Sequence, residues 1–434
     1  MAIAYFNDGE YDLATLQFEQ LSRSAPDHPA AFLFLGMIAH KKSEYPHAVE
    51  CFEESGNLAF GYPDSILSYA QSLYKSNQEQ KSLLVLDKLD ETAGVSSKQW
   101  SEAGQLYCSL GRYDQALKEF EQARKLDPSL PNLDYLRAYV LSKMGRSNEA
   151  VETLQNLTAR EPDSDPLNLL GNVARDAGKV QLSVEAFQRA LAVAPDSEEN
   201  YLDYSTLLMS HGNTAGGLDV VKIGLEHLPR SYRLTVQEGA LLVNLGRPKE
   251  AQQAFRSAMG LLNDNKEAFL GLAVAQVRSD FLDEALKTYV EGVQKFPYDF
   301  NLNYYYASAL FRIAQQQRLK GEAMDRTRRA IDKAIQLNPR STAAFYLRAK
   351  YYVALDTDPQ MAIADLKTCL RLEPRYIPAT YQLARLLLKT GNKQEGQNLL
   401  AKLRELQAEE LKKEEDDPRI AIRNSGTPAQ ILAR

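Results

Sequence analysis

Residues 97–128 read SKQWSEAGQLYCSLGRYDQALKEFEQARKLDP, and the first half of this stretch predicts a helix. Trp100, Gly104 and Tyr107 recur at a spacing of three or four residues, so they share one face of that helix. Gly111 follows the last of them, and glycine readily adopts the positive φ that ends a helix. We therefore expect a first helix from Ser97 to the residues just before this glycine.

The second half of the stretch predicts a second helix that packs on the first. Ala116, Phe120 and Ala123 share one of its faces, and Pro128 follows it because proline cannot continue a helix. The small residues Gly104 and Ala116 let the two helices approach closely, while the Phe120 ring fills the remaining gap. The stretch is thus one helix–turn–helix unit.

The pattern recurs along most of the chain. The turn glycine returns at spacings of 34, 33, 34 and 34 residues, at Gly111, Gly145, Gly178, Gly212 and Gly246. The closing proline returns at Pro128, Pro162, Pro195, Pro229 and, one repeat skipped, Pro297. The large apolar position of the second helix is occupied by Phe52, Leu86, Phe120, Leu154, Phe187, Val221, Phe255 and Tyr289. So long a period predicts stacked repeats that pack on their neighbours.

The repeat resembles the tetratricopeptide repeat, whose pattern is Trp, a small residue, Tyr, Ala, Phe, Ala and Pro at fixed offsets. The resemblance implies an all-α, right-handed superhelical solenoid of stacked helix–turn–helix repeats. We expect a partial repeat at 1–28, a tandem array of about eleven repeats at 29–404, a C-terminal capping helix at 405–417 and a flexible tail at 418–434.

Several repeats depart from the pattern. The expected repeat starts are Pro29, Pro63, Ser97, Pro131, Ser164, Glu198, Tyr232, Lys266 and Phe300, with a last repeat from Ile377. Asn77 stands at the turn of the repeat from Pro63. Three glycines in the second helix of the repeat from Glu198 predict a soft point, because each costs about 1 kcal/mol relative to alanine. The spacing between Pro297 and Pro339 grows to 42, which predicts a longer first helix or loop around residues 314–324.

The first repeat is incomplete, because only residues 1–7 precede its second helix. Either the N-terminus was trimmed or the array starts with a short cap. No signal peptide is visible in the sequence as written, so we expect a cytoplasmic protein, or a periplasmic or exported one if an N-terminal signal has been removed. An incomplete repeat exposes apolar surface, so self-association through the N-terminal edge is a further expectation.

Composition and motifs argue against chemistry within this chain. No window approaches 18 consecutive apolar residues, which predicts no membrane span. Phosphate-loop, dinucleotide, zinc-protease and nucleophile-elbow motifs are absent, so we expect no enzyme activity and no cofactor. His47 and Cys51 are four apart and could share a helix face, but further metal ligands are missing, so we expect no metal. Cys369 stands where Ala123 stands in its own repeat, which predicts a packed small residue.

Charge is distributed unevenly along the chain. Residues 300–404 carry 18 Lys and Arg against 8 Asp and Glu, a net charge of +10, whereas residues 1–299 carry 28 against 42, a net charge of −14. Such asymmetry bears on partners rather than on the fold. It favours an acidic partner for the basic end, although solvated helix surface explains it equally well. Nucleic acid is not the expected partner, because a single segment is basic and the sequence pI is about 5.6.

The resemblance also implies a binding face. In that family, partner contacts come largely from the second, fifth, ninth, twelfth and thirteenth positions of the first helix, on the concave side. Toward the C-terminus these positions predict a ladder of Tyr and cations, which we call the C-terminal ladder: Tyr304, Phe311, Arg312, Tyr346, Lys350, Tyr381, Arg385 and Lys389. In the middle of the chain they predict a second set: Tyr135, Tyr139, Asn168, Asn172 and Arg175. Tyrosine is frequent in this chain, so amphipathic surface is the alternative interpretation of both sets.

We therefore expect a non-enzymatic scaffold that binds a peptide or protein segment along its concave face, with an acidic or aromatic segment at the C-terminal ladder. A second interpretation is the repeat region of a larger enzyme or of a secretion or assembly machine, such as a glycosyltransferase that carries these repeats. The Lys, Asn, Asn, Lys, Arg set by which one subgroup of the family holds a chaperone's C-terminal carboxylate is not found in three adjacent repeats.

Overall fold

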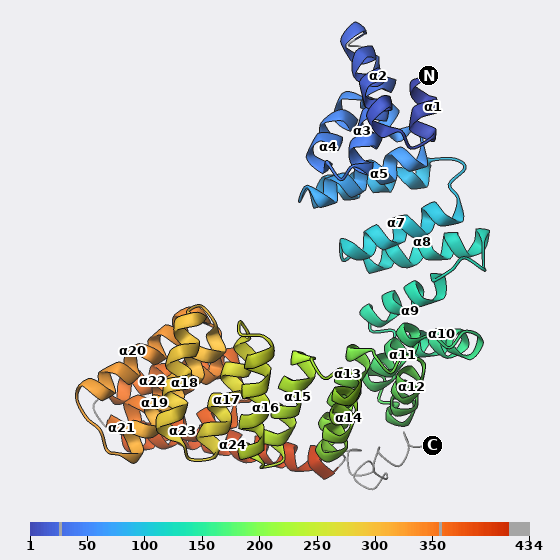
Figure 1. The fold of residues 1–434 in the computed structure, drawn as a ribbon. Helices are drawn as coiled ribbons and strands as arrows, with labels where there is room; N and C mark the ends of the chain where they lie inside the picture. The colour runs from blue at the N-terminus through green and yellow to red at the C-terminus, as the bar shows by residue number, and fades with distance from the viewer. Residues whose placement is uncertain (26–27, 356–357, 416–434) are drawn as a thin grey trace. The chain divides into compact units, whose positions relative to one another are not determined.

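The computed structural model describes residues 1–25, 28–355 and 358–415, and every regular element in these ranges is helical. This confirms the all-α fold of stacked helix pairs. The chain forms two compact units, Met1–Val193 (unit 1) and Ala194–Arg434 (unit 2). Figure 1 shows that each unit is built from successive pairs of helices.

Unit 1 contains six pairs within its described residues. The first helices are α1 (Ala2–Asn7), α3 (Pro29–Lys41), α5 (Pro63–Lys75), α7 (Ser97–Ser109), α9 (Leu133–Lys143) and α11 (Ser164–Asp176). The second helices are α2 (Tyr11–Ser24), α4 (Tyr45–Glu54), α6 (Glu79–Leu86), α8 (Tyr113–Leu126), α10 (Ser147–Arg160) and α12 (Val180–Val193). Two short 3₁₀ helices, η1 (Gly56–Phe60) and η2 (Asp87–Glu91), follow α4 and α6 and were not predicted.

Unit 2 has the same construction. Its first helices are α13 (Glu198–Ser210), α15 (Tyr232–Asn244), α17 (Lys266–Arg278), α19 (Phe300–Gln316), α21 (Thr342–Leu355) and α23 (Ile377–Lys389). Its second helices are α14 (Thr214–His227), α16 (Pro248–Leu261), α18 (Leu282–Lys295), α20 (Glu322–Leu337), α22 (Pro359–Leu372) and α24 (Lys393–Glu415). In both units the largest packing interfaces lie within a pair or between successive pairs.

The helix starts follow the predicted positions with one exception. Nine of the ten expected starts coincide with the first residue of α3, α5, α7, α11, α13, α15, α17, α19 or α23. Helix α9 begins at Leu133 rather than Pro131, because Asn132 has a φ of 63° and cannot lie inside a right-handed helix. Ser96 fixes the start of α7, since its side chain accepts from the backbone N–H of Gln99 while the Gln99 side chain returns to the Ser96 backbone.

The turns within the pairs need a left-handed residue, and the predicted positions provide it. Gly111 has a φ of 68°, and the other predicted turn glycines lie between 72° and 80°. Other described repeats have another residue at this position, and Ser43, Asn77 and Asp280 make the same turn with a φ of 63°, 58° and 63°. Asparagine tolerates this region better than most residues, which explains why Asn77 does not interrupt the array.

The core confirms the predicted register of the second helices. All eight residues at the large apolar position are buried, with exposed fractions of 0–2%: Phe52, Leu86, Phe120, Leu154, Phe187, Val221, Phe255 and Tyr289. The predicted soft point in α14 has a packing reason, because a Cβ on Gly224 would lie 2.8 Å from Cγ of Tyr201. The glycines of α14 thus permit close approach of α13, which offsets their poor helix propensity.

Two features at the C-terminal side extend beyond one standard repeat. The predicted insertion lengthens α19 to 17 residues and α20 to 16, with a short loop between them. Helix α24 runs through residue 404 without a break, so the predicted capping helix from residue 405 is a continuation of the last repeat. Residues 416–417 of that prediction, and the tail predicted at 418–434, lie outside the described residues. None of the helices described is both long and apolar enough to cross a membrane.

Candidate binding groove

The first helices of unit 1 from α3 to α11 form one continuous row. Helix α3 contacts α5, α5 contacts α7, α7 contacts α9, and α9 contacts α11, in addition to the contacts of each with its own second helix. This row is possible because the small and apolar residues of each first helix face the partner helices and leave its opposite side uncovered. The uncovered side carries two hollows.

The first hollow, which we call the lysine hollow, has a volume of about 730 Å³. It is lined by side chains from α1, α3, α5 and α7 and the start of α2, including Phe6, Tyr11, Met37, His40, Lys41, Asp64, Leu67, Gln71, Tyr74, Lys75, Lys98, Glu102, Gln105 and Ser109. Most of these residues recur at one turn's spacing on their helices, so a single face of each helix contributes. The hollow therefore extends across successive repeats.

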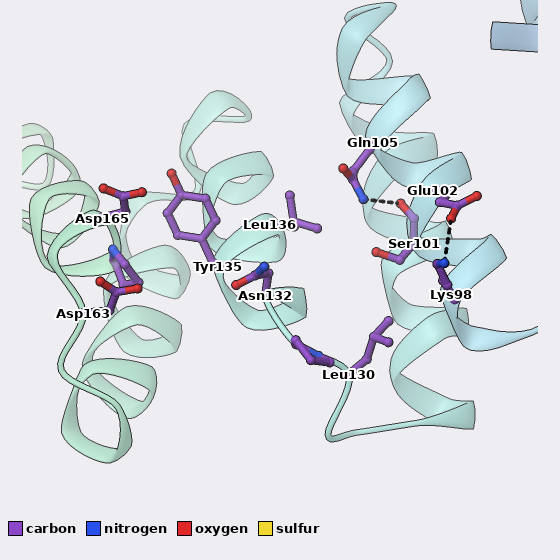
Figure 2. Close-up of a pocket in the computed structure, with 12 residues that line it drawn as sticks. Lys98, Ser101, Glu102, Gln105, Leu130, Asn132, Tyr135, Leu136, Asp163 and Asp165 are labelled. Atoms are coloured by element: carbon purple, nitrogen blue, oxygen red, sulfur yellow. Dashed lines mark hydrogen bonds and ion pairs between the residues drawn. The ribbon is translucent and has the colours of Figure 1, made fainter. Parts of the chain in front are cut away.

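The second hollow, which we call the aspartate hollow, has a volume of about 560 Å³ and is drawn in Figure 2. It lies between α7, α9 and the start of α11, and is lined by Lys98, Ser101, Glu102, Gln105, Leu130, Pro131, Asn132, Tyr135, Leu136, Asp163, Asp165 and Pro166. Lys98, Glu102 and Gln105 line both hollows. The two hollows therefore adjoin along α7, and we call them together the unit 1 groove.

Polar side chains on α7 are held in place by local interactions. The Gln105 side-chain amide donates to the Ser101 carbonyl at 3.4 Å, and Lys98 Nζ lies 3.9 Å from a Glu102 carboxylate oxygen, as Figure 2 shows. At the lysine hollow, the Asp64 carboxylate accepts a hydrogen bond from Gln99 Nε2 at 2.6 Å. The wall at α7 is thus polar but close to electrically neutral.

Burial sets the protonation of two groove residues. The pKa of His40 is lowered, first by burial and then by the neighbouring Lys41, so the imidazole stays neutral around pH 7. His40 Nδ1 lies 3.0 Å from the Ser72 hydroxyl oxygen. The pKa of Tyr135 is raised, first by burial and then by the Asp165 carboxylate, so its hydroxyl remains a hydrogen-bond donor.

The structure places the predicted middle set on the first helices α9 and α11. Tyr135 lines the aspartate hollow, and Tyr139 is half-buried with Lys143 Nζ 5.2 Å from its ring centre. Asn172 Nδ2 donates to the Asn168 side-chain oxygen at 3.1 Å, so these two amides satisfy part of each other's hydrogen-bonding capacity. Arg175 forms an ion pair with Asp176 at 3.2 Å. Within this set, Tyr135 is the residue that the structure places in a groove.

The C-terminal ladder is brought together in part. Lys350 Nζ lies 6.0 Å from the Tyr346 ring centre, and the Tyr346 ring meets that of Tyr376 edge-on at 5.4 Å. Burial, followed by the hydroxyls of Tyr346 and Tyr304, raises the pKa of Tyr376 to about 12, so the three tyrosines share one environment. Tyr376 was not predicted, because it precedes the first residue of α23.

The outer members of the ladder are separate from that cluster. Tyr381, Arg385 and Lys389 are exposed on α23. Arg312 is exposed at the end of α19, where its guanidinium lies 3.7 Å from the Asp280 carboxylate. These positions are compatible with the predicted face.

The prediction for Phe311 is wrong. Its exposed fraction is 2%, and its ring packs in the core at 6.3 Å from the Tyr351 ring. The reason is contact with the next repeat, because Tyr351 belongs to α21, which packs on α19. Lys350 Nζ lies 5.9 Å from the Phe311 ring centre. Phe311 therefore packs against Lys350 of the ladder and is too deeply buried to contact a partner.

His47 and Cys51 lie close together on α4, as their spacing predicts, and Cys369 is packed in the core. Cys51 Sγ lies 3.7 Å from His47 Nε2, and no group of three or more His, Cys, Asp and Glu in the described part of the chain could hold a metal ion. Cys369 is fully buried, as predicted for a packed small residue, and burial raises its pKa to about 12. A thiol with such a pKa stays protonated and unreactive near neutral pH.

Comparison with known proteins agrees with this architecture. The family model described as TPR repeat matches residues 104–145, and two described as tetratricopeptide repeat match residues 355–413 and residues 1–56 with 135–199. The chain belongs to the tetratricopeptide repeat family. Such a repeat scaffold fits a protein-interaction function.

Two relatives of this tetratricopeptide repeat protein are named for the repeat itself. A TPR repeat-containing protein of Methanocaldococcus jannaschii is 22% identical over 425 residues, which cover 89% of this chain and 71% of that protein. The TPR repeat-containing protein YpiA of Bacillus subtilis is 20% identical over 323 residues, which cover 73% of this chain and 75% of that protein. Among solved structures, yeast Tom70 aligns over 100% of this chain and 97% of its own, with 15% identity and a TM-score of 0.49.

Proposed function

We propose that this protein is a non-enzymatic scaffold whose unit 1 groove binds an extended segment of a partner protein. The observation that carries the proposal is the continuity of the lysine and aspartate hollows along α7. A small molecule would use one enclosed cavity, whereas adjoining hollows along several repeats suit a chain that lies across the helices.

The lining of the groove supports a peptide ligand. Amide and hydroxyl side chains, among them Gln71, Gln105 and Tyr135, line it beside the apolar surfaces of Met37 and Leu67. Amides and hydroxyls can both donate to and accept from a peptide backbone, and apolar surface can take side chains of the partner. The helices that present these groups are held by their own buried faces, so the groove exists before the partner arrives.

The proposal is tested by selection from a random dodecapeptide library displayed on phage, with the full chain as the target. Gln105 is exposed and lines both hollows, so Gln105→Trp would fill the groove at its centre. We expect selected peptides to lose at least tenfold in affinity for Gln105→Trp. Gln155→Trp on the outer helix α10, where Gln155 is also exposed, serves as the matched control and should bind as the parent does.

Circular dichroism and thermal unfolding of both variants establish that the tryptophans leave the fold intact. Selected peptides that bind Gln105→Trp as well as the parent would place the binding face elsewhere and refute the proposal. The proposal would also be refuted if a bound peptide protected the second helices, rather than α5, α7 and α9, from hydrogen exchange.

A further inference from the structure

We infer that the partner segment of the unit 1 groove has separated charges, with acidic residues seated in the lysine hollow and basic residues seated in the aspartate hollow. This inference rests on the proposed function and adds the chemistry of the ligand to it. It derives from the net charge of the lining residues, which is positive near α3 and negative near α11.

The lysine hollow offers cations that lack an internal partner. Lys41 and Lys75 are exposed at the ends of α3 and α5, and neither forms an ion pair within the described part of the chain. Lys75 Nζ lies 5.7 Å from the centre of the Tyr74 ring, which also lines the hollow. His40 adds no opposing charge. The Asp64 carboxylate accepts from Gln99 but keeps its negative charge, and Lys98 lies beside Glu102, so Lys41 and Lys75 leave the lining of this hollow with one positive charge in excess. A carboxylate of a partner is the complementary group for this pair of ammonium groups.

The aspartate hollow carries the opposite charge. Asp163 and Asp165 are exposed at the start of α11, and both line the hollow beside Tyr135, as Figure 2 shows. Asp163 Oδ1 accepts from the Ser164 backbone N–H at 2.6 Å, which leaves the rest of its carboxylate facing the solvent. Lys98 is the basic residue of this hollow, and its ammonium lies beside Glu102. The end of the groove at α11 is therefore net acidic, and a Lys or Arg of a partner complements it.

The separation of these charges sets the length of the ligand. Neighbouring packed helices lie about 8–10 Å apart, so the row from α3 to α11 spans about 40 Å. An extended chain covers about 3.3 Å per residue, so about twelve residues span the row. An acidic block and a basic block separated by about six neutral residues would therefore meet the two hollows simultaneously.

The same four groups also lie at helix ends. Lysines near a helix C-terminus and aspartates near a helix N-terminus complement the helix dipole and can stabilise the fold by about 0.3–1 kcal/mol each. A change in stability on substitution would therefore not distinguish the two roles. A preference between two peptides of identical composition would distinguish the two roles, because the effect of the helix dipole on stability does not depend on the order of residues in a ligand.

The experiment compares two fluorescein-labelled dodecapeptides by anisotropy against the full chain. One has three Glu, six Ser or Gln and three Lys in that order, and the other has the same residues with Glu and Lys alternating. We expect the separated peptide to bind at least tenfold more tightly at 50 mM salt, with the difference shrinking at 300 mM because screening weakens exposed charge pairs.

Charge reversal tests the assignment to the lysine hollow. Lys41→Glu with Lys75→Glu should abolish the preference for the separated peptide. Lys125→Glu with Lys179→Glu changes the net charge equally at exposed positions outside the groove, and should keep the preference. Neutralisation of the aspartate hollow by Asp163→Asn with Asp165→Asn should also reduce the preference for the separated peptide. Unfolding curves recorded for each variant distinguish an effect on binding from an effect on stability.

The outcomes discriminate between the two proposals. Binding of both peptides within twofold of each other, abolished by Gln105→Trp, would overturn the charge order and leave the groove function standing. A preference that survives Lys41→Glu with Lys75→Glu would overturn the assignment to the lysine hollow. Absence of binding by either peptide overturns the charge order as well, while the library selection decides the groove function by itself. Binding that Gln105→Trp does not affect would place these peptides outside the groove and refute the inference.

Discussion

A Cβ atom on Gly104 would lie 2.5 Å from Cε1 of Phe120. The Phe120 ring of α8 therefore fills the space that a side chain at position 104 of α7 would need. The same relationship recurs in the repeats where Gly171 faces Phe187 and Gly239 faces Phe255. It explains at atomic detail why a small residue in the first helix accompanies a large one in the second.

Removal of the ring should destabilise unit 1. Phe120→Ala leaves a cavity at a fully buried position and should lower the free energy of unfolding by about 3–5 kcal/mol. Gly104→Ala should cost about 1–3 kcal/mol in the parent through overpacking, but little in the Phe120→Ala background, because the alanine then has room. Urea unfolding and amide hydrogen exchange in α7 and α8 provide the measurement. Additive effects of the two substitutions would contradict the contact.

A buried carboxyl group should make unit 1 sensitive to pH. Glu119 on α8 is 2% exposed, and its Oε2 has no hydrogen-bond partner within the described residues. Burial, then the carboxylates of Asp90 and Asp87, raise its pKa to about 7, although Lys118 Nζ at 3.7 Å opposes the rise. The folded state therefore binds this proton more tightly than the unfolded state does.

Stability should consequently fall as pH rises from the unfolded pKa of about 4.5 through the folded pKa of about 7, by about 3 kcal/mol from this group. Glu119→Gln should remove that part of the pH dependence and make the protein more stable than the parent at pH 8. Urea unfolding between pH 5 and pH 8 measures both effects. Glu152→Gln, at an exposed position of α10, is the control and should change neither. A parent whose stability is level over this range would refute the assignment.

The C-terminal ladder should bind a segment rich in Glu and Phe through α23. Tyr381 is 47% exposed and precedes Arg385 by one helical turn, so the two can contact one ligand. Tyr381→Ala with Arg385→Ala should weaken a labelled peptide of that composition about tenfold or more, without loss of helicity. Met361→Ala with Arg371→Ala, at exposed positions of α22, is the matched control. Equal affinity of both double variants would remove the ladder from the binding face.

The N-terminal edge should mediate self-association. Leu13 and Leu16 are 44% and 61% exposed on α2, and Ile3 is 52% exposed on α1. Burial of these side chains against a second copy removes apolar surface from water at about 25 cal/mol per Å². Sedimentation velocity should show a concentration-dependent dimer that Leu13→Glu with Leu16→Glu abolishes. Leu84→Glu, at a residue 68% exposed on α6, should leave it intact, and a parent that sediments as a monomer at high concentration would contradict the prediction.

The repeat register was predictable because it depends on contacts between residues close in sequence. A turn residue, a small residue and a large one recur within one helix pair, so periodicity locates them without knowledge of distant segments. The insertion near residue 314 was also visible as a change of spacing. The burial of Phe311 was not, because it depends on how α21 of the next repeat packs on α19.

The unit 1 groove was largely missed, although Tyr135 was named. Aromatic stripes are conspicuous in this sequence, whereas Lys41, Lys75, Asp163 and Asp165 are scattered charges at helix ends, which are common on any solvated helix. A signal existed in the register itself, since Lys41 and Lys75 both occupy the last position of their first helices. Which side of the helix row is hollow, however, depends on packing between repeats, so the register alone does not locate the groove.

Within each unit, the largest interfaces of a helix pair join its two helices to each other and connect the pair to its neighbours, and this arrangement has a mechanical consequence. A force applied at the two ends of such a stack passes through every interface in series, so the weakest one yields first and the remainder stay folded. Each released pair of about 34 residues would add about 110 Å of contour length. Each unit would therefore lengthen in discrete increments and recoil as the pairs re-form, in the manner of a spring.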